Sequence, residues 1–424
     1  MKIIFRNFRI ADAFTDMTGT VVVDGDKIAA VFPGPEKPAC PAAGECGEIV
    51  FDGRGRLVLT SGFVDMHAHF REAVTPCGEG DGGGGKETLE SASLAAARGG
   101  YTSVVCMANT TPAIDSAAAA VSVKRRSDAL GLVNLYPAVS LTEGRRGTTL
   151  SPCLVCPPGT AGYRPPLLSD DGSDVADDGL FAAALARAAE YGILVSCHCD
   201  IGGEAAAVER AVRLWSGNGA AGRLHIAHVS TAGAAELVRR QKRQPCGGKL
   251  SAEATPHHIA LTARDGEAAG AETFGRVAPP LRAEADRRAV IEALRDGSIN
   301  AIATDHAPHT TDDKLNGAPG FSGLETAFAV CNTALVKENG FSPQKLFSLM
   351  SAEPARLLGL DGAGAVAPGK NADLVILDME REIVFDGEKL ASRGKNSLFL
   401  GKKLFGAALL TLCEGKIVYH SPSF

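Results

Sequence analysis

The middle of the chain repeats one unit: a helix-like stretch, a glycine stop and a short apolar run. In the first copy, apolar residues recur at helical spacing over Glu87–Arg98, Gly99–Gly100 interrupts them, and the mostly apolar run Tyr101–Met107 follows. Similar units cover 181–197 and 287–303. A buried parallel strand gives a continuous apolar run and its neighbouring helix gives a 3.6-residue period. The repeat therefore predicts an α/β fold with a parallel sheet.

Further apolar runs bring the predicted strands to seven or eight over about 300 residues. The clearest runs are 62–66, 101–107, 133–138, 193–197, 224–227, 249–254 and 299–303. One more helix and strand are hard to place in 148–168, which is rich in Pro, Cys and Gly. This number and spacing predict a (β/α)8 TIM barrel over residues 56–359.

Both ends of the chain have a different pattern. Short β-like runs fill 1–55, with the turn Asp24–Gly25–Asp26 between two of them, and similar runs flank Glu414–Gly415. Two β-rich ends around a barrel predict one small β-sandwich domain made of residues 1–55 and 360–424. The glycine-rich run Gly78–Gly85 is expected to form a mobile loop.

Composition excludes several classes of protein. The chain has 424 residues, of which 45% are apolar and 22% charged, so it is not a disordered protein. A net charge of −6 argues against a nucleic-acid-binding protein, which needs a basic surface. No apolar run is long enough to cross a membrane, and the start MKIIFRNFRI lacks the apolar core of a signal peptide. We interpret the eleven irregularly spaced cysteines as reduced thiols of a cytoplasmic protein.

Histidine and aspartate side chains stand at the carboxyl ends of the predicted strands. His67 and His69 are two apart at the end of the first strand, so they face the same way, and His198, His228 and Asp305 end later strands. A lone histidine at a strand end more often packs or caps. Several histidines and an aspartate together at the carboxyl ends of barrel strands, where barrel enzymes have their active sites, instead predict the N/O ligand set of a divalent metal such as zinc.

These residues and their neighbours resemble the amidohydrolase superfamily, and within it the dihydroorotase branch. The resembling segments are 61–72 (SGFVDMHAHFRE), 96–102 (AARGGYT), 227–231 (AHVST), 279–282 (PPLR), 303–309 (ATDHAPH) and 323–327 (GLETA). The resemblance extends over nearly the whole chain. It implies one or two Zn2+ ions per subunit, with other divalent metals as alternatives.

The resemblance also implies a bridging ligand between two metals. In the hydantoinase and allantoinase branches this ligand is a carboxylated lysine, but no lysine stands between Lys124 and Lys242. Residues 168–172 (LSDDG) resemble instead the bacterial-type dihydroorotases, in which the second aspartate bridges the metals. Asp171 is therefore the bridging candidate. The alternative is that Asp170–Asp171–Gly172 is only a turn.

The activity implied by the resemblance is the reversible cyclisation of N-carbamoyl-L-aspartate to L-dihydroorotate in pyrimidine biosynthesis. Asp305 would accept a proton from the water held between the metals and pass it to the leaving nitrogen. Arg71, Asn109 and His309 would bind the substrate carboxylate. The alternatives are a surface charge for Arg71, a helix N-cap for Asn109 and an ordinary loop residue for His309.

The chain departs from the family pattern in several places. Ala278 stands where the family usually has asparagine, Pro319–Gly320 replaces Pro-Phe-Gly, and Arg71–Glu72–Ala73–Val74 replaces Arg-Glu-Pro-Gly. Substrate recognition therefore stays open between dihydroorotase and an allantoinase or hydantoinase. A third alternative is a non-catalytic partner of aspartate transcarbamoylase. Association with that enzyme and homodimer formation are the macromolecular partnerships that the resemblance implies.

Overall fold

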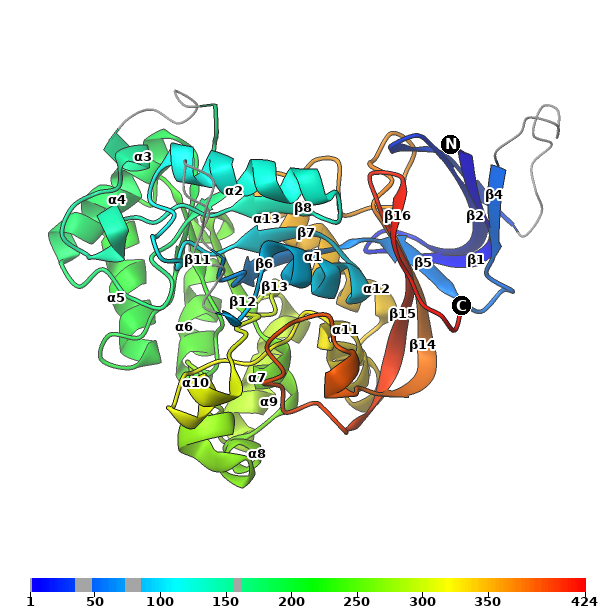
Figure 1. Ribbon diagram of the computed structural model, residues 1–424. Helices are drawn as coiled ribbons and strands as arrows, with labels where there is room; N and C mark the ends of the chain where they lie inside the picture. Colours follow the sequence, from blue (N-terminus) through cyan, green and yellow to red (C-terminus); the bar gives the residue numbers. More distant parts are fainter. Residues whose placement is uncertain (1, 35–47, 73–84, 156–161) are drawn as a thin grey trace.

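The computed structural model describes residues 2–34, 48–72, 85–155 and 162–424 (Figure 1). The predicted loop Gly78–Gly85 lies outside these ranges except for Gly85. A barrel with its helices forms one side of the molecule, and a β domain that contains both chain ends forms the other. No helix in these ranges combines the length and the apolarity needed to cross a membrane.

Eight parallel strands form the barrel, as the sequence predicts. Each strand pairs with its neighbours in chain order within two sheets, and the bridges Val139–Leu168 and Ala68–His306 join those sheets into a closed ring. The strands are β6 (Phe63–Ala68), β7 (Tyr101–Cys106), β8 (Asn134–Pro137), β9 (Leu167–Leu168), β10 (Leu194–Cys197), β11 (Arg223–Ile226), β12 (Leu250–Ala254) and β13 (Ala301–Ile302). β9 gives no recognisable apolar run, because its two leucines stand between Pro165–Pro166 and Ser169–Asp170, whereas the equally short β13 lies within the apolar stretch 299–303.

Several of the helices that follow these strands begin at residues with capping side chains. Thr88, Ser116, Asp177 and Thr231 each accept a hydrogen bond from a backbone N–H of the first turn. The longer helices are α1 (Leu89–Arg98), α2 (Ala117–Leu130), α4 (Asp178–Glu190), α5 (Glu204–Gly217), α6 (Ala232–Lys242) and α9 (Glu284–Asp296). The shorter ones are α3 (Pro152–Val155), α7 (Pro256–Ala260), α8 (Ala263–Ala268), α10 (Thr311–Leu315), α11 (Ala327–Cys331), α12 (Pro343–Phe347) and α13 (Glu353–Leu358).

The β domain is one hydrogen-bonded sheet of eight strands drawn from both ends of the chain. Its order is β16-β15-β14-β5-β1-β2-β3, with β4 paired to β1. The strands are β1 (Lys2–Ala11), β2 (Asp16–Asp24), β3 (Lys27–Pro33), β4 (Glu48–Asp52), β5 (Val58–Ser61), β14 (Leu374–Val384), β15 (Lys403–Cys413) and β16 (Lys416–His420). The two predicted hairpins are present, with turns at Gly25 and Glu414–Gly415.

This sheet has its own apolar core, which combines residues from the two ends of the chain. Phe5, Phe8 and Leu59 from the first end pack with Leu374 and Leu410 from the second. We propose residues 1–55 and 360–424 as the domain and 56–359 as the barrel. β5 pairs within the sheet of the β domain but lies after residue 55, the first proposed boundary. It is followed almost directly by β6, the first strand of the barrel.

Candidate metal centre

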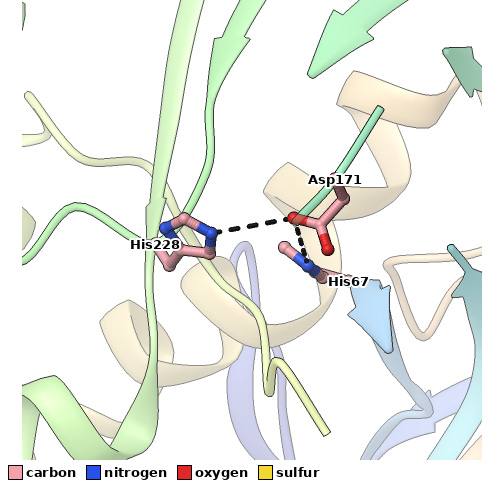
Figure 2. Close-up of side chains that lie close together, drawn as sticks. All are labelled: His67, Asp171 and His228. Atoms are coloured by element: carbon pink, nitrogen blue, oxygen red, sulfur yellow. Dashed lines mark ion pairs between the residues drawn. The ribbon is translucent and has the colours of Figure 1, made fainter. Parts of the chain in front are cut away.

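All six predicted metal ligands lie together at the carboxyl end of the barrel. His67 and His69 are at the end of β6, and the other four follow β9, β10, β11 and β13: Asp171, His198, His228 and Asp305. Figure 2 shows three of them, with the imidazoles of His67 and His228 both facing the same carboxylate oxygen of Asp171. His198 is partly exposed, and the other five are buried.

The two carboxylate oxygens of Asp171 face different histidines. Oδ1 lies 3.2 Å from His67 Nε2, 3.3 Å from His198 Nδ1 and 3.7 Å from His228 Nε2. Oδ2 lies 3.4 Å from His69 Nε2. The carboxylate therefore contacts imidazoles of β6 and imidazoles that follow later strands, as a bridging ligand would, with His67 on the same oxygen as His198 and His228. The Asp171–Gly172 turn therefore presents a side chain to the cluster as well as reversing the chain.

Asp305 lies on the His67–His69 side of the cluster. Its Oδ1 is 3.0 Å from His69 Nε2 and 3.6 Å from His67 Nε2. Donor atoms of His67, His69 and Asp305 fall within 4.8 Å of one another, and so do those of His67, Asp171 and His228. Both groups could hold a metal ion.

Two buried polar atoms without hydrogen-bond partners indicate that a cation fits this cluster. His67 Nε2 and Asp171 Oδ1 are buried, and neither has a hydrogen-bond partner. Leaving such atoms unpaired costs about 1–3 kcal/mol each. Both atoms carry lone pairs, so a divalent cation placed near them would remove the penalty from both at once. The donor set, four imidazoles and two carboxylates, is one that zinc accepts.

The electrostatics of the cluster keep its two carboxylates ionised. Burial opposes ionisation of Asp305, but the neighbouring His67 and His69 outweigh it and hold its pKa below the ordinary value. Asp171 behaves in the same way, because burial is outweighed by the neighbouring imidazoles of His67, His198 and His228. Burial and the charge of Arg71 lower the pKa of His69, so its imidazole is neutral near pH 7. Ionised carboxylates and neutral imidazoles are the forms that bind metals. Against the effect of burial, Asp171 and Asp305 raise the pKa of His67, and Asp171 raises that of His198, so a metal would displace protons from these two imidazoles.

Two residues orient the histidines of β6. Glu253, in β12, lies 2.8 Å from His67 Nδ1 and 3.0 Å from His225 Nε2. Burial opposes ionisation of Glu253, but the bonds from His225 and His67 lower its pKa to about 2. The carboxylate therefore accepts the Nδ1–H of His67 and leaves Nε2 free to bind a metal. Asn109 Oδ1 lies 2.8 Å from His69 Nδ1 and has the same effect there.

Glu253 was not among the residues predicted from the sequence. Its signal is a single carboxylate within the otherwise small and apolar strand β12, which is buried throughout. A buried carboxylate needs partners, so such a residue next to a metal cluster is a candidate to orient a ligand. The predicted N-cap alternative for Asn109 is wrong, because Ser116 caps the following helix α2.

Arg71 and His309 lie beside each other next to the cluster. Arg71 Nη2 is 3.4 Å from His309 Nε2, and Arg71 Nε is buried without a hydrogen-bond partner. His309 Nε2 lies 2.9 Å from the carbonyl oxygen of Pro319, so this nitrogen carries the proton and donates it. Burial and Arg71 lower the pKa of His309 to about 3. The surface-charge alternative for Arg71 is wrong, because the residue is half-buried and its Nε is fully covered.

A further cationic side chain, Arg145, supports the Asp171 turn and was not predicted. Its Nη2 donates to the carbonyl oxygen of Asp171 and to Ser173 Oγ. A Cβ on Gly172 would lie 3.4 Å from Arg145 Nη2 and 3.8 Å from Asn109 Nδ2, and Gly172 has a φ of +76°. A Cβ would therefore make only ordinary contacts here, and glycine is favoured because of the left-handed backbone of the turn.

Comparisons with known proteins agree with this geometry. The model of the amidohydrolase family matches residues 58–418. A dihydroorotase from Thermoanaerobacter sp. (strain X514) is 36% identical, over 99% of this chain and 97% of the relative. A dihydroorotase from Thermus aquaticus is 37% identical, over 99% of both chains.

Solved structures share the fold at lower identity. An L-hydantoinase from Arthrobacter aurescens superposes with a TM-score of 0.82 at 23% identity, over 99% of this chain and 96% of the other. A dihydropyrimidinase from Brevibacillus agri gives 0.81 at 19% identity, over 99% and 95%. Family match, full-length relatives and fold agree: the chain belongs to the amidohydrolase family.

Proposed function

We propose that this protein is a dihydroorotase, which interconverts N-carbamoyl-L-aspartate and L-dihydroorotate. The observation that carries the proposal is that the N/O cluster lies beside the half-buried guanidinium of Arg71, whose Nε is buried without a hydrogen-bond partner. The cluster suits a hydrolase of amide bonds, and Arg71 suits a substrate with a carboxylate. The near-complete alignment with dihydroorotases supports the same substrate.

The residues assigned to the metals rest on the His67–His69–Asp305 donor group and on the resemblance to bacterial-type dihydroorotases; the distances place His67 beside both Asp305 and Asp171. We assign His67, His69 and Asp305 to one zinc ion, His198 and His228 to a second, and Asp171 to both. Bound divalent cations would polarise the ring carbonyl and lower the pKa of a water molecule. A site with one ion, or with another divalent metal, would use a subset of the same ligands.

Asp305 is the proposed proton carrier. In hydrolysis it takes a proton from the attacking water as the new C–O bond forms. When the C–N bond of the ring breaks, Asp305 delivers that proton to the leaving nitrogen, and ring closure is the reverse. Its lowered pKa keeps it ionised and ready to accept the proton. The neighbouring His306 cannot take over this role, because its Nδ1 accepts from Gly323 N–H and its Nε2 faces Glu87.

Arg71, Asn109 and His309 are proposed to bind the substrate carboxylate. The guanidinium of Arg71 supplies a charged fork, and Asn109 supplies the amide nitrogen that its bond to His69 leaves available. His309 is neutral in the structure. A carboxylate placed beside it would favour its protonated form and strengthen the contact.

Two other functions compete with this proposal. A hydantoinase shares the fold, but its cyclic substrate has no carboxylate to pair with Arg71, and the lysine of that branch is absent. A non-catalytic partner of aspartate transcarbamoylase would not need the complete ligand set that this chain keeps. A homodimer, association with aspartate transcarbamoylase and a cytoplasmic location remain predictions from the sequence.

The test is an assay of both directions on protein of measured metal content, with dihydroorotate, hydantoin and allantoin as alternative substrates. We expect turnover of dihydroorotate and of N-carbamoyl-L-aspartate only. Asp305→Asn should lower kcat by about 10²–10⁴-fold, the range for general acid–base catalysis. The control is Asp312→Asn, an exposed carboxylate on α10, which should keep normal activity. Preferred turnover of hydantoin or allantoin would contradict the proposal.

A further inference from the structure

A segment of the C-terminal β domain lies against the catalytic end of the barrel. The connection between β14 and β15 leaves the sheet, and residues 390–399 of it, here named the strap, contact the loop that follows β13 (Figure 1). Alternate strap residues are buried: Ser392, Gly394 and Asn396 face the barrel, whereas Arg393 and Lys395 are exposed. The strap therefore presents one defined face to the loop that carries Asp305 and His309.

Asn396 is the main contact between the strap and this loop. Its Oδ1 accepts hydrogen bonds from His309 N–H and from Ser322 Oγ, each 2.9 Å long. Its Nδ2 donates to the carbonyl oxygens of Ala307 and Gly320, each at 3.0 Å. The side chain is only 7% exposed. The side-chain amide of Asn396 therefore forms hydrogen bonds with two segments of the loop, 307–309 and 320–322.

Gly394 brings the strap into direct contact with the backbone of His309. A Cβ added there would lie 2.6 Å from Pro308 Cβ and 2.8 Å from His309 N. No side chain fits in that space without movement of Pro308 or His309. Ser392 adds a third contact, because its Oγ donates to Glu87, which also faces His306. The strap is therefore packed against the residues on both sides of Ala307.

We propose that Asn396 is a positioning residue for recognition of the substrate carboxylate, acting through His309. Its hydrogen bond from His309 N–H fixes the position of the His309 backbone. Its hydrogen bond to Gly320 O fixes the position of the adjacent Pro319, whose carbonyl oxygen accepts a hydrogen bond from His309 Nε2–H. Asn396 thus fixes both the backbone and the ring of His309 beside Arg71. The inference rests on the proposed function, because it takes His309 as a substrate contact.

The first test replaces Asn396 with alanine and measures kcat and KM for dihydroorotate. We expect KM to rise and kcat/KM to fall roughly tenfold or more, because small misplacement of a binding group is costly. Metal content should not change. The matched control is Asn332→Ala, also a buried asparagine, whose Nδ2 donates to Met379 O and Phe405 O away from the site. It should lose stability without a rise in KM.

A double variant separates positioning from general destabilisation. In a His309→Ala background, Asn396→Ala should reduce kcat/KM less than twofold further, because its route to the substrate is already gone. An equal loss in both backgrounds, an unchanged KM in Asn396→Ala, or loss of metal would overturn the inference. If the alanine variant does not fold, Asn396→Ser retains one hydroxyl donor and should shift KM in the same direction. A wild-type enzyme without dihydroorotase activity would instead refute the proposed function.

Discussion

Three residues of the candidate site have a left-handed backbone that their side chains disfavour. Arg71, His228 and Asp305 have φ values of +59°, +31° and +45°. Such conformations persist only where the surrounding structure imposes them, and they often occur at functional sites. For Asp305 the constraint is visible on both sides, because Thr304 bonds to Asp65 and His306 lies between Glu87 and Gly323. Strain at these positions directs side chains toward the cluster.

Arg71 allows a direct test of substrate charge recognition. Arg71→Met keeps the length of the side chain but removes the guanidinium, and a hydrogen bond to a charged group is worth about 1.5–3 kcal/mol. We expect kcat/KM for dihydroorotate to fall roughly tenfold or more, mostly through KM, with bound metal unchanged. Steady-state kinetics and metal analysis of the same preparation would measure both quantities.

The control for this variant is Arg288→Met, on the surface of α9, where the arginine pairs with Glu284 of its own helix. Its kinetics should match those of the wild type. Normal kcat/KM in Arg71→Met would show that Arg71 does not contact the substrate carboxylate.

At the scale of elements, the short helix α10 is anchored by a buried lysine. Lys314 is fully buried, and its Nζ donates to the carbonyl oxygens of Arg276, Ala318 and Gly320. Three acceptors match the three N–H donors of an ammonium group, so the amine is satisfied without a carboxylate. These bonds tie α10 to the same turn that Asn396 holds from the strap.

This arrangement predicts a dependence of stability on alkaline pH. Burial lowers the pKa of Lys314 from 10.5 to about 8. Between these values the unfolded chain binds more protons than the folded one, so this group makes the free energy of unfolding rise with pH. From pH 8 to pH 10, wild type should gain about 1–2 kcal/mol relative to Lys314→Met. Denaturant unfolding at several pH values would measure the difference.

The comparison variant is Lys402→Met, which removes an exposed lysine and no buried amine. It separates the effect of Lys314 from the general loss of one positive charge. A constant difference between wild type and Lys314→Met over this pH range would mean that the buried amine does not titrate there.

The elements differ in how far the sequence predicts them. Most barrel strands follow from their apolar runs, because burial on both faces requires such runs, but β9 has two residues and leaves no pattern. The ligands at strand ends follow from the barrel geometry. The role of Glu253 depends on which side chains it faces, and the contact of Asn396 with His309 joins residues far apart in the chain. Such tertiary contacts leave no local periodicity, so only the structure reveals them.

At the scale of the whole molecule, the candidate ligands join distant parts of the barrel. They come from β6 and from the segments after β9, β10, β11 and β13, so bound metal would connect five of the eight strand positions. Without a cation, the cluster retains unpaired buried atoms at His67 and Asp171. The barrel itself is closed by backbone bridges and packed around its own core, so we expect it to fold without metal but with lower stability.

Metal removal should therefore lower the melting temperature by a few degrees, and added Zn2+ should restore it. A ligand that binds only the folded state at 100 times its Kd stabilises it by about 2.7 kcal/mol. Thermal unfolding of chelated and reloaded protein, with metal content measured on each sample, gives the shift.

In a His198→Ala variant, which lacks one proposed ligand, the same Zn2+ concentration should raise Tm less. The Asp312→Asn variant should respond as the wild type does. An unchanged Tm after complete metal loss would show that the metal binds without stabilising the barrel. The six proposed ligands would then contribute nothing, through the metal, to the stability of the folded barrel.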